Sequence, residues 1–234
     1  MKPKVAHVHL SGCTGCLVSL VDSYEKLLEI LNAVDIVYST TLVDVREYPE
    51  DVDVALVEGS VCLSHKESVE LIKKVRENSK IVVALGSCSA CGGVTRFSRG
   101  GQLGRPEHDS FSPVTEVIDV DFSLVGCPPG TESIVKLILA LLNGDEDYLK
   151  PYKQAVELSE ADGRLLFKRV INKGLCIGCG TCAASCQTRA ITIVDGRPEI
   201  NEGRCINCGV CIFQCPRYFL PLEFMEKKVK EGSL

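Results

Sequence analysis

Eight of the 14 cysteines in this 234-residue chain fall into two copies of one spacing near its end. Each copy reads Cys-x-x-Cys-x-x-Cys-x-x-x-Cys, at Cys176, Cys179, Cys182 and Cys186 and again at Cys205, Cys208, Cys211 and Cys215, which Pro216 follows. In two-cluster ferredoxins the first three thiolates of such a run bind one cubane, and the fourth ligates the other. The spacing therefore predicts two [4Fe-4S] clusters, one on Cys176, Cys179, Cys182 and Cys215, the other on Cys205, Cys208, Cys211 and Cys186.

Zinc is the alternative ligand for such pairs, because two Cys-x-x-Cys pairs can form a four-thiolate site. The duplicated order of eight cysteines favours iron-sulfur clusters. The start of the chain has neither an apolar signal region nor twin arginines, so we expect a cytoplasmic protein whose thiols bind metal.

Composition narrows the class of protein further. The net charge of −5 argues against nucleic-acid binding. The sequence has no apolar run of the roughly 18 residues that a membrane span needs. We therefore expect neither a nucleic-acid partner nor a transmembrane segment.

The remaining six cysteines follow apolar segments that have the composition of buried strands. Cys13 and Cys16 follow residues 4–10, Cys62 follows 52–57, Cys88 and Cys91 follow 80–85, and Cys127 follows a strand within 117–125. Ligands of an open parallel sheet gather at the carboxyl ends of its strands. We expect a third [4Fe-4S] cluster there, held by Cys13, Cys16, one cysteine of the Cys88 loop and Cys127. Spacing alone does not separate Cys88 from Cys91, and Cys62 and Cys91 also fit the pattern of small buried side chains.

These strands, with another expected within 34–45, alternate with segments of helical period. The helices are expected at 17–31, 64–77 and 131–142. Near-continuous apolar strands between helices predict an α/β domain, a parallel sheet covered on both faces, over residues 1–150. After a connection at 146–168, a small α+β ferredoxin-like domain with two clusters is expected over 165–220, with a strand at 190–194 and a turn at 195–196.

Four short motifs in the first domain resemble those of the small subunits of [NiFe]-hydrogenases. They are Ser-Gly-Cys-Thr-Gly-Cys at 11–16, Val-Glu-Gly-Ser at 57–60, Gly-Ser-Cys at 86–88 and Gly-Cys-Pro-Pro at 126–129. The resemblance implies a flavodoxin-like fold and a proximal cluster on Cys13, Cys16, Cys88 and Cys127. The loop at 96–102 and the entry to the second domain at 174–182 look most like the gamma subunits of coenzyme F420-reducing hydrogenases.

That resemblance also implies partners and a division of labour. Hydrogen would be split at a Ni-Fe centre in a large (alpha) subunit, and a flavin-containing (beta) subunit with FAD would reduce coenzyme F420. The chain would relay electrons between them through three [4Fe-4S] clusters, with no catalytic residue of its own. The alternatives are a small subunit of another hydrogenase that reduces NAD(P) or sulfur compounds, or of a complex I-related assembly. A free ferredoxin fused to an FMN-binding flavodoxin domain is the alternative from another class.

Glu58 is a further candidate for the first site. Some gamma subunits of this type use a carboxylate as one proximal ligand, and the resemblance places such a substitute near Glu58 and Cys62. A solvated or ion-paired side chain is the alternative for Glu58. His7, His9, His65 and His108 are expected to be packing or surface residues.

Overall fold

A computed structural model of the chain describes residues 2–96, 110–158, 166, 170–172, 174–206 and 208–218. In these ranges five strands form one sheet in the order β2-β1-β3-β5-β7. All neighbouring pairs are parallel. The strands are β1 (Lys4–His9), β2 (Asp35–Ser39), β3 (Val52–Glu58), β5 (Ser79–Leu85) and β7 (Phe122–Leu124). This is the flavodoxin-like strand order, and it confirms the predicted α/β class.

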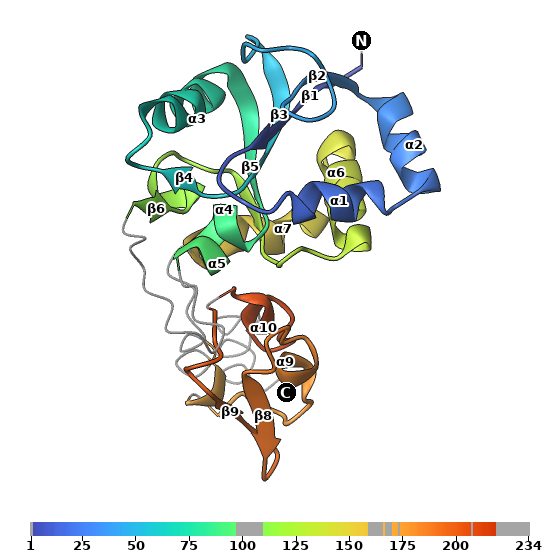
Figure 1. Ribbon diagram of the computed structural model, residues 1–234. Coiled ribbons are helices and arrows are strands. Elements are labelled where there is room, and N and C mark those ends of the chain that lie inside the picture. The colour runs from blue at the N-terminus through green and yellow to red at the C-terminus, as the bar shows by residue number, and fades with distance from the viewer. Residues whose placement is uncertain are drawn as a thin grey trace, which may run out of the picture.

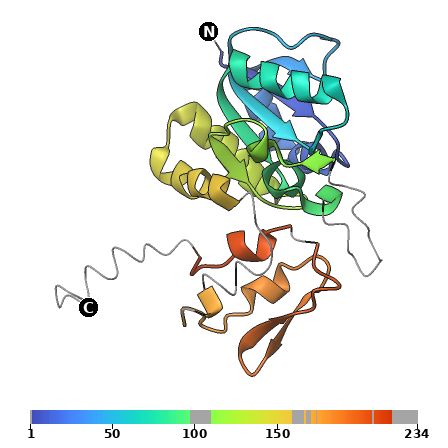
Figure 2. The ribbon, with the colours of Figure 1, turned by 90° about the vertical axis from the view of Figure 1, so that its left-hand side faces the viewer.

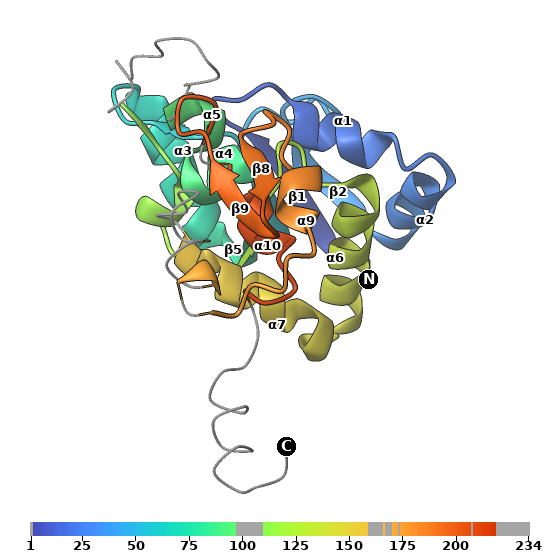
Figure 3. The same ribbon diagram turned by 90° about the horizontal axis from the view of Figure 1, so that it is seen from below.

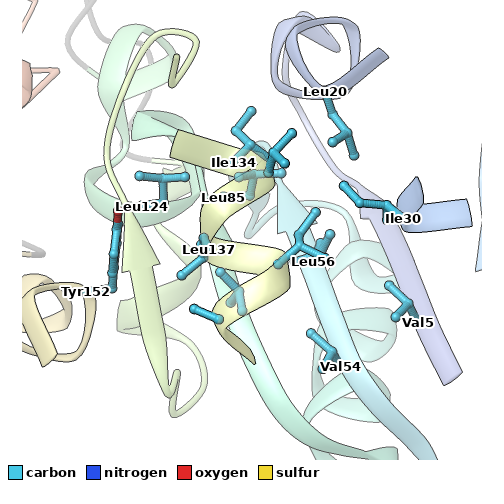
Figure 4. Close-up of a cluster of buried hydrophobic side chains, with 14 of the residues drawn as sticks. Val5, Leu20, Ile30, Val54, Leu56, Leu85, Leu124, Ile134, Leu137 and Tyr152 are labelled. Carbon is cyan, nitrogen blue, oxygen red and sulfur yellow. The ribbon is translucent and has the colours of Figure 1, made fainter. Parts of the chain in front are cut away.

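Helices cover both faces of the sheet because successive strand residues point to opposite sides (Figure 1). On one face, Val54 and Leu56 of β3 share a core cluster with Ile134 and Leu137, as Figure 4 shows. The helices on this face are α1 (Gly15–Val21), α2 (Glu25–Ala33), α6 (Thr131–Asn143) and α7 (Glu146–Gln154). On the other face, Ala55 and Val57 pack with Ile72 and Val75 of α3 (Lys66–Asn78).

The prediction of a single helix over 17–31 is wrong, because the structure has two helices there. The chain leaves α1 after Val21 and begins α2 at Glu25, and Tyr24 between them has a φ of 50°. Leu20 and Ile30 still belong to the same core cluster. A shared apolar stripe continued across the break, so periodicity did not detect the turn.

Short elements follow the strands at their carboxyl ends. The strand β4 (Val61–Cys62) pairs antiparallel with β6 (Phe111–Ser112). After β5 come α4 (Ser87–Cys91) and α5 (Gly93–Arg96), and a 3-10 turn, η1 (Val114–Glu116), precedes β7. Residues 97–102 of the predicted loop, and His108, lie outside the described residues.

The connection expected at 146–168 begins with the helix α7, which the sequence analysis missed. A 3-10 turn, η2 (Ala155–Leu158), follows it. Leu149 and Tyr152 of α7 are buried in the core of the sheet domain, although Pro151 lies within the helix. The apolar positions of this helix are too few and too widely spaced to produce a sustained pattern.

The second part of the chain is a small α+β unit, as predicted. It contains α9 (Thr181–Ala184), β8 (Ile191–Val194), β9 (Arg197–Ile200) and α10 (Val210–Phe213). The strands β8 and β9 form an antiparallel hairpin. Its two turn residues, Asp195 and Gly196, have φ values of 50° and 73°, which suits a two-residue turn between twisted strands. None of the helices in the described ranges is long and apolar enough to cross a bilayer.

Candidate metal centres

A pocket at the carboxyl edge of the sheet collects cysteines from loops that are distant in sequence. We call it the sheet-edge pocket. Its lining is made of Gly12, Cys13, Thr14, Gly15, Cys16, Glu58, Gly59, Ser87, Cys88, Gly126, Cys127 and Pro128. Cys13 and Cys16 follow β1, Cys88 follows β5 and Cys127 follows β7. Their loops meet because these strands are parallel and lie together in the sheet, with β3 between β1 and β5. The fold thus brings Cys13, Cys16, Cys88 and Cys127 together, and their ligation of one cluster stays a prediction.

Hydrogen bonds tie the four loops around this pocket to one another. The backbones of Ser11 and Ser60 exchange two bonds, of 3.1 and 2.8 Å. The Ser60 hydroxyl donates to the Cys88 carbonyl at 2.9 Å. The Ser87 amide donates to the Gly126 carbonyl at 2.8 Å. The spacing of the cysteines therefore depends on contacts between loops, not on any one loop alone.

Two glycines are required where these loops approach each other. Gly86 has a φ of +84°, and a Cβ there would lie 2.3 Å from the Cys16 Sγ. Gly59 has a φ of +87°, and a Cβ would lie 2.8 Å from the Leu10 carbonyl carbon. Glycine alone combines this backbone conformation with the absence of a side chain.

The thiols of the sheet-edge pocket influence one another electrostatically. The pKa of Cys127 is raised to about 11, first by burial and then by the neighbouring thiols of Cys88, Cys208 and Cys13. Burial, the charge of Glu58 and the neighbouring Cys88 and Cys13 raise the pKa of Cys16. Cysteine binds iron as the thiolate, so binding of a metal group in this pocket would release protons and relieve this mutual repulsion.

Glu58 closes one side of the pocket and is almost completely buried, at 2% exposure. Its Oε2 accepts a bond from the Leu17 amide at 3.1 Å. Its Oε1 lies 2.9 Å from the His9 Nδ1 and 3.3 Å from the His7 Nε2. Burial alone would raise the pKa of Glu58, but hydrogen bonds and the charges of the two histidines lower it to about 2. The buried carboxylate is therefore ionised, and the His7 and His9 rings lie against one of its oxygens.

The contact of the two histidines with Glu58 was not predicted from the sequence. His7 and His9 were predicted to be packing or surface residues. His7 is buried, and both rings face the carboxylate because β1 pairs with β3 in a register that places His9 opposite Glu58. The only sequence signal was two histidines, two positions apart, in an otherwise apolar strand. A polar pair on one face of a buried strand indicates a polar partner nearby.

Cys62 and Cys91 do not line the sheet-edge pocket. The Cys62 thiol lies 3.3 Å from the Ser64 hydroxyl, and Cys62 lines a separate hollow together with Leu10 and Ser11. The Cys91 thiol is fully buried and donates to the Ser87 carbonyl at 3.2 Å. Burial raises the pKa of Cys91 to about 12. The structure therefore favours Cys88 over Cys91 as the member of the first set.

In the second part of the chain, the crossed sets expected from spacing lie together. A pocket is lined by Cys176, Cys179, Cys182 and Cys215; we call these the far set. The other four cysteines, Cys186, Cys205, Cys208 and Cys211, form the near set. After burial, Cys186 and Cys205 raise the pKa of Cys208. Burial, Cys208, Cys205 and Cys186 likewise raise the pKa of Cys211, so the four thiols are neighbours. Which atoms bind iron stays a prediction for both sets.

The two sets are built by the same local geometry. Gly180 and Gly209 each follow a cysteine and precede a four-residue helix, with φ values of 75° and 73°. The left-handed glycine turns the chain into the helix, so that Cys182 and Cys211 are the second residues of α9 and α10. Hence the internal repeat of the sequence is also a repeat of structure.

The three sets of thiols suit cubane clusters better than single ions. Over the described residues, no three His, Cys, Asp or Glu side chains are grouped for one metal ion. A cubane carries its iron atoms at separate corners, so its four thiolates stand further apart than the ligands of one tetrahedral zinc ion.

The second part packs on the carboxyl edge of the sheet (Figures 1 and 2). Ile191 and Ile212 share a buried apolar cluster with Ala84, Ala90 and Val125. The rings of Tyr152 and Phe213 lie 5.5 Å apart between centroids. The near set is the one that meets the sheet-edge pocket, since Cys208 is close enough to Cys127 to raise its pKa.

Known families match both parts of the chain. Residues 13–141 match the family described as NADH ubiquinone oxidoreductase, 20 Kd subunit, and residues 175–223 match the 4Fe-4S dicluster domain. The structure of an NAD+-reducing [NiFe]-hydrogenase in the H2-reduced state is similar, with a TM-score of 0.52 and 28% identity over 62% of this chain and 93% of that chain. Fold and cysteine sets thus define the class of iron-sulfur proteins that includes hydrogenase small subunits.

Gamma subunits of coenzyme F420 hydrogenases are more similar still. The one from Methanococcus voltae is 52% identical over 211 residues, which cover 83% of this chain and 87% of the relative. The one from Methanosarcina barkeri is 51% identical over 210 residues, covering 85% and 81%. The chain belongs to the family of coenzyme F420 hydrogenase gamma subunits. With its 4Fe-4S dicluster domain, it is an electron-transfer subunit of a hydrogenase.

Proposed function

We propose that the chain relays electrons in a cytoplasmic [NiFe]-hydrogenase from a large subunit, where hydrogen is oxidised, to a flavin-containing subunit that reduces coenzyme F420. Its own cofactors are three [4Fe-4S] clusters, on the sheet-edge set (Cys13, Cys16, Cys88 and Cys127), the near set and the far set. The Ni-Fe centre, FAD and coenzyme F420 belong to the partner subunits. The family relationship and the three cysteine sets support this assignment.

The observation that carries the proposal is the continuous order of the three sets. Cys127 of the sheet-edge set lies beside Cys208 of the near set. Cys211 of the near set lies beside Cys182 of the far set. No set is isolated from the next, so the chain provides a route from one end to the other. When bound, the clusters supply one-electron redox chemistry along this route.

The chain's own residues hold the route in place and shield its middle. None of the four near-set cysteines is fully exposed, and Cys186 and Cys211 pack against the apolar cluster around Ile191 and Ile212. Exclusion of water and hydrogen bonds to sulfur tune the potential of an iron-sulfur site. Buried neighbours thus give the near set an environment that differs from those of the two ends.

Both ends of the route reach the surface. Cys13 is exposed at the sheet-edge pocket, and Cys179 is exposed at the far set. Beside the far set, Ile177 and Ile193 are 58% and 39% exposed. We assign the Cys13 end to the large subunit and the Cys179 end to the flavin subunit, because the family resemblance makes the sheet-edge cluster the one proximal to the Ni-Fe centre.

Cofactor content and the identity of the co-purifying chains test the proposal. After anaerobic purification of the native complex, about 12 iron atoms per copy of this chain are expected in addition to the iron held by the partner subunits, with no flavin bound to the chain itself. A large hydrogenase subunit and a flavin subunit are expected to accompany it. About eight iron atoms per chain, together with FMN bound to the chain, would refute the proposal.

A further inference from the structure

The contact between the two parts of the chain is mostly apolar. Ala84, Ala90 and Val125 on one side meet Ile191 and Ile212 on the other. Figure 3 shows the second part in front of the carboxyl edge of the sheet. Apolar contacts are non-directional. They favour association of the two parts without selecting the atoms that face each other.

Ser87 adds a directional contact to this junction. Its side chain is buried, at 1% exposure. The Ser87 hydroxyl donates to the Cys208 carbonyl at 2.5 Å, and it accepts from the Gly126 amide at 3.1 Å. One oxygen atom therefore joins the residue before Cys127 to the backbone of Cys208, across the junction.

Ser87 lies where the sheet-edge set and the near set of cysteines meet. Ser87 precedes Cys88 in the chain, and it lines the sheet-edge pocket. Its carbonyl also accepts the Cys91 thiol. The residue thus contacts the Cys127 loop, the Cys208 loop and the buried Cys91 at the boundary between two cysteine sets.

We propose that Ser87 is a positioning residue that fixes the near set against the sheet-edge pocket, and so sets the separation across which the first internal electron transfer occurs. This inference rests on the proposed function. In that transfer, one electron passes from the sheet-edge site to the near site, and no bond is made or broken. Because transfer between buried sites depends on their separation, a loosened junction slows it without changing the iron content.

Ser89 provides a matched control. It lies in the same short helix and is fully buried. Within the described part of the chain, its hydroxyl has no hydrogen-bond partner. Ser87→Ala and Ser89→Ala each delete one buried oxygen atom. Only Ser87→Ala removes hydrogen bonds, those to the Cys208 carbonyl and from the Gly126 amide.

The experiment compares the wild-type complex with the two variants, each purified anaerobically as the intact assembly. Hydrogen exchange is measured at the Gly126 amide and over residues 208–212. In Ser87→Ala, loss of this hydrogen bond is expected to raise exchange at both places about tenfold. Freeze-quench EPR after hydrogen addition is expected to show slower reduction of the near site, with the signal of the sheet-edge site appearing at its usual rate. Ser89→Ala is expected to match the wild type in both measurements.

Two results would overturn the inference. The first is that Ser87→Ala and Ser89→Ala show the same hydrogen-exchange rates and the same rate of reduction of the near site. The other is faster exchange at Gly126 alone, which would restrict the role of the hydroxyl to its own domain. Iron content separates this inference from the function on which it rests, because a wild-type chain with about eight iron atoms contradicts the proposed function whatever the exchange shows.

Discussion

The sheet-edge pocket takes its cysteines from three loops that lie far apart in the sequence, whereas the near and far sets come from two adjacent copies of one short motif. In the pocket, the relative positions depend on strand order and on bonds between loops. In the ferredoxin-like part, they depend on a left-handed glycine and one turn of helix in each copy. A site of the first kind should be sensitive to substitutions well outside its ligands, and a site of the second kind mainly to substitutions in its own loop.

Removing a cysteine of the pocket tests whether the two regions are independent, and it has the largest expected effect. Cys127→Ala is expected to lose about four of about 12 iron atoms and to abolish hydrogen-driven reduction of the near and far sites. Dithionite should still reduce those sites, because their cysteines are untouched. Iron analysis and EPR measure both outcomes. The control, Cys62→Ala, is expected to keep all its iron; intact hydrogen-dependent F420 reduction in Cys127→Ala would contradict the ligand assignment.

A pair of glycine substitutions sharpens the contrast between the two kinds of site. Gly86→Ala introduces a Cβ 2.3 Å from the Cys16 Sγ at a φ of +84°. Strain and overpacking together are expected to destabilise the chain by about 2–5 kcal/mol and to displace Cys16. Gly180→Ala has a similar φ, +75°, but its nearest neighbour is 4.0 Å away, so backbone strain of about 1–2 kcal/mol remains. Thermal unfolding of both variants measures the difference, and equal destabilisation would contradict the spatial argument.

The pH dependence of Glu58 tests the polar contacts that only the pocket contains. Its pKa is lowered from 4.5 to about 2, so ionised Glu58 contributes about 3 kcal/mol of stability above pH 4.5, and this contribution is lost as the pH falls towards 2. Infrared difference spectra of the wild type minus Glu58→Gln should still show the Glu58 carboxylate band at pH 3.5. Protonation of Glu58 by that pH would contradict its pairing with His7 and His9.

The smallest predicted effect concerns a bond between loops. Ser60→Ala removes the hydroxyl that donates to the Cys88 carbonyl at 2.9 Å. The loss should cost about 1–2 kcal/mol in the free energy of unfolding, because the Cys88 carbonyl keeps the Gly92 amide but loses this donor, and the Thr95 hydroxyl loses its own bond to the removed hydroxyl. The control is Ser123→Ala, whose hydroxyl is buried and, over the described residues, has no hydrogen-bond partner. Denaturant unfolding should show a change in Ser60→Ala alone.

Much of the fold followed from local patterns. The strands β1, β3 and β5 were predicted because their residues are almost continuously apolar, as in strands buried on both faces. The break between α1 and α2 and the helix α7 were not predicted. In the first case one apolar stripe spans two helices, and in the second Leu149 and Tyr152 are too few to give a pattern. Their burial comes from the shape of the surrounding core.

By itself, the sequence determined the three groups of cysteines, the parallel α/β class and the repeated ferredoxin-like unit. Cysteine spacing in the repeats acts over a few residues, where local turn geometry decides which thiols can meet. Spacing alone left Cys88 and Cys91 open and the family resemblance implied Cys88; the tertiary structure places Cys88, and not Cys91, in the pocket with Cys13, Cys16 and Cys127. It also decided that His7 and His9 hold Glu58, and that Ser87 meets Cys208. These pairs are separated by tens of residues, and strand order and domain packing bring them together, which no local pattern encodes.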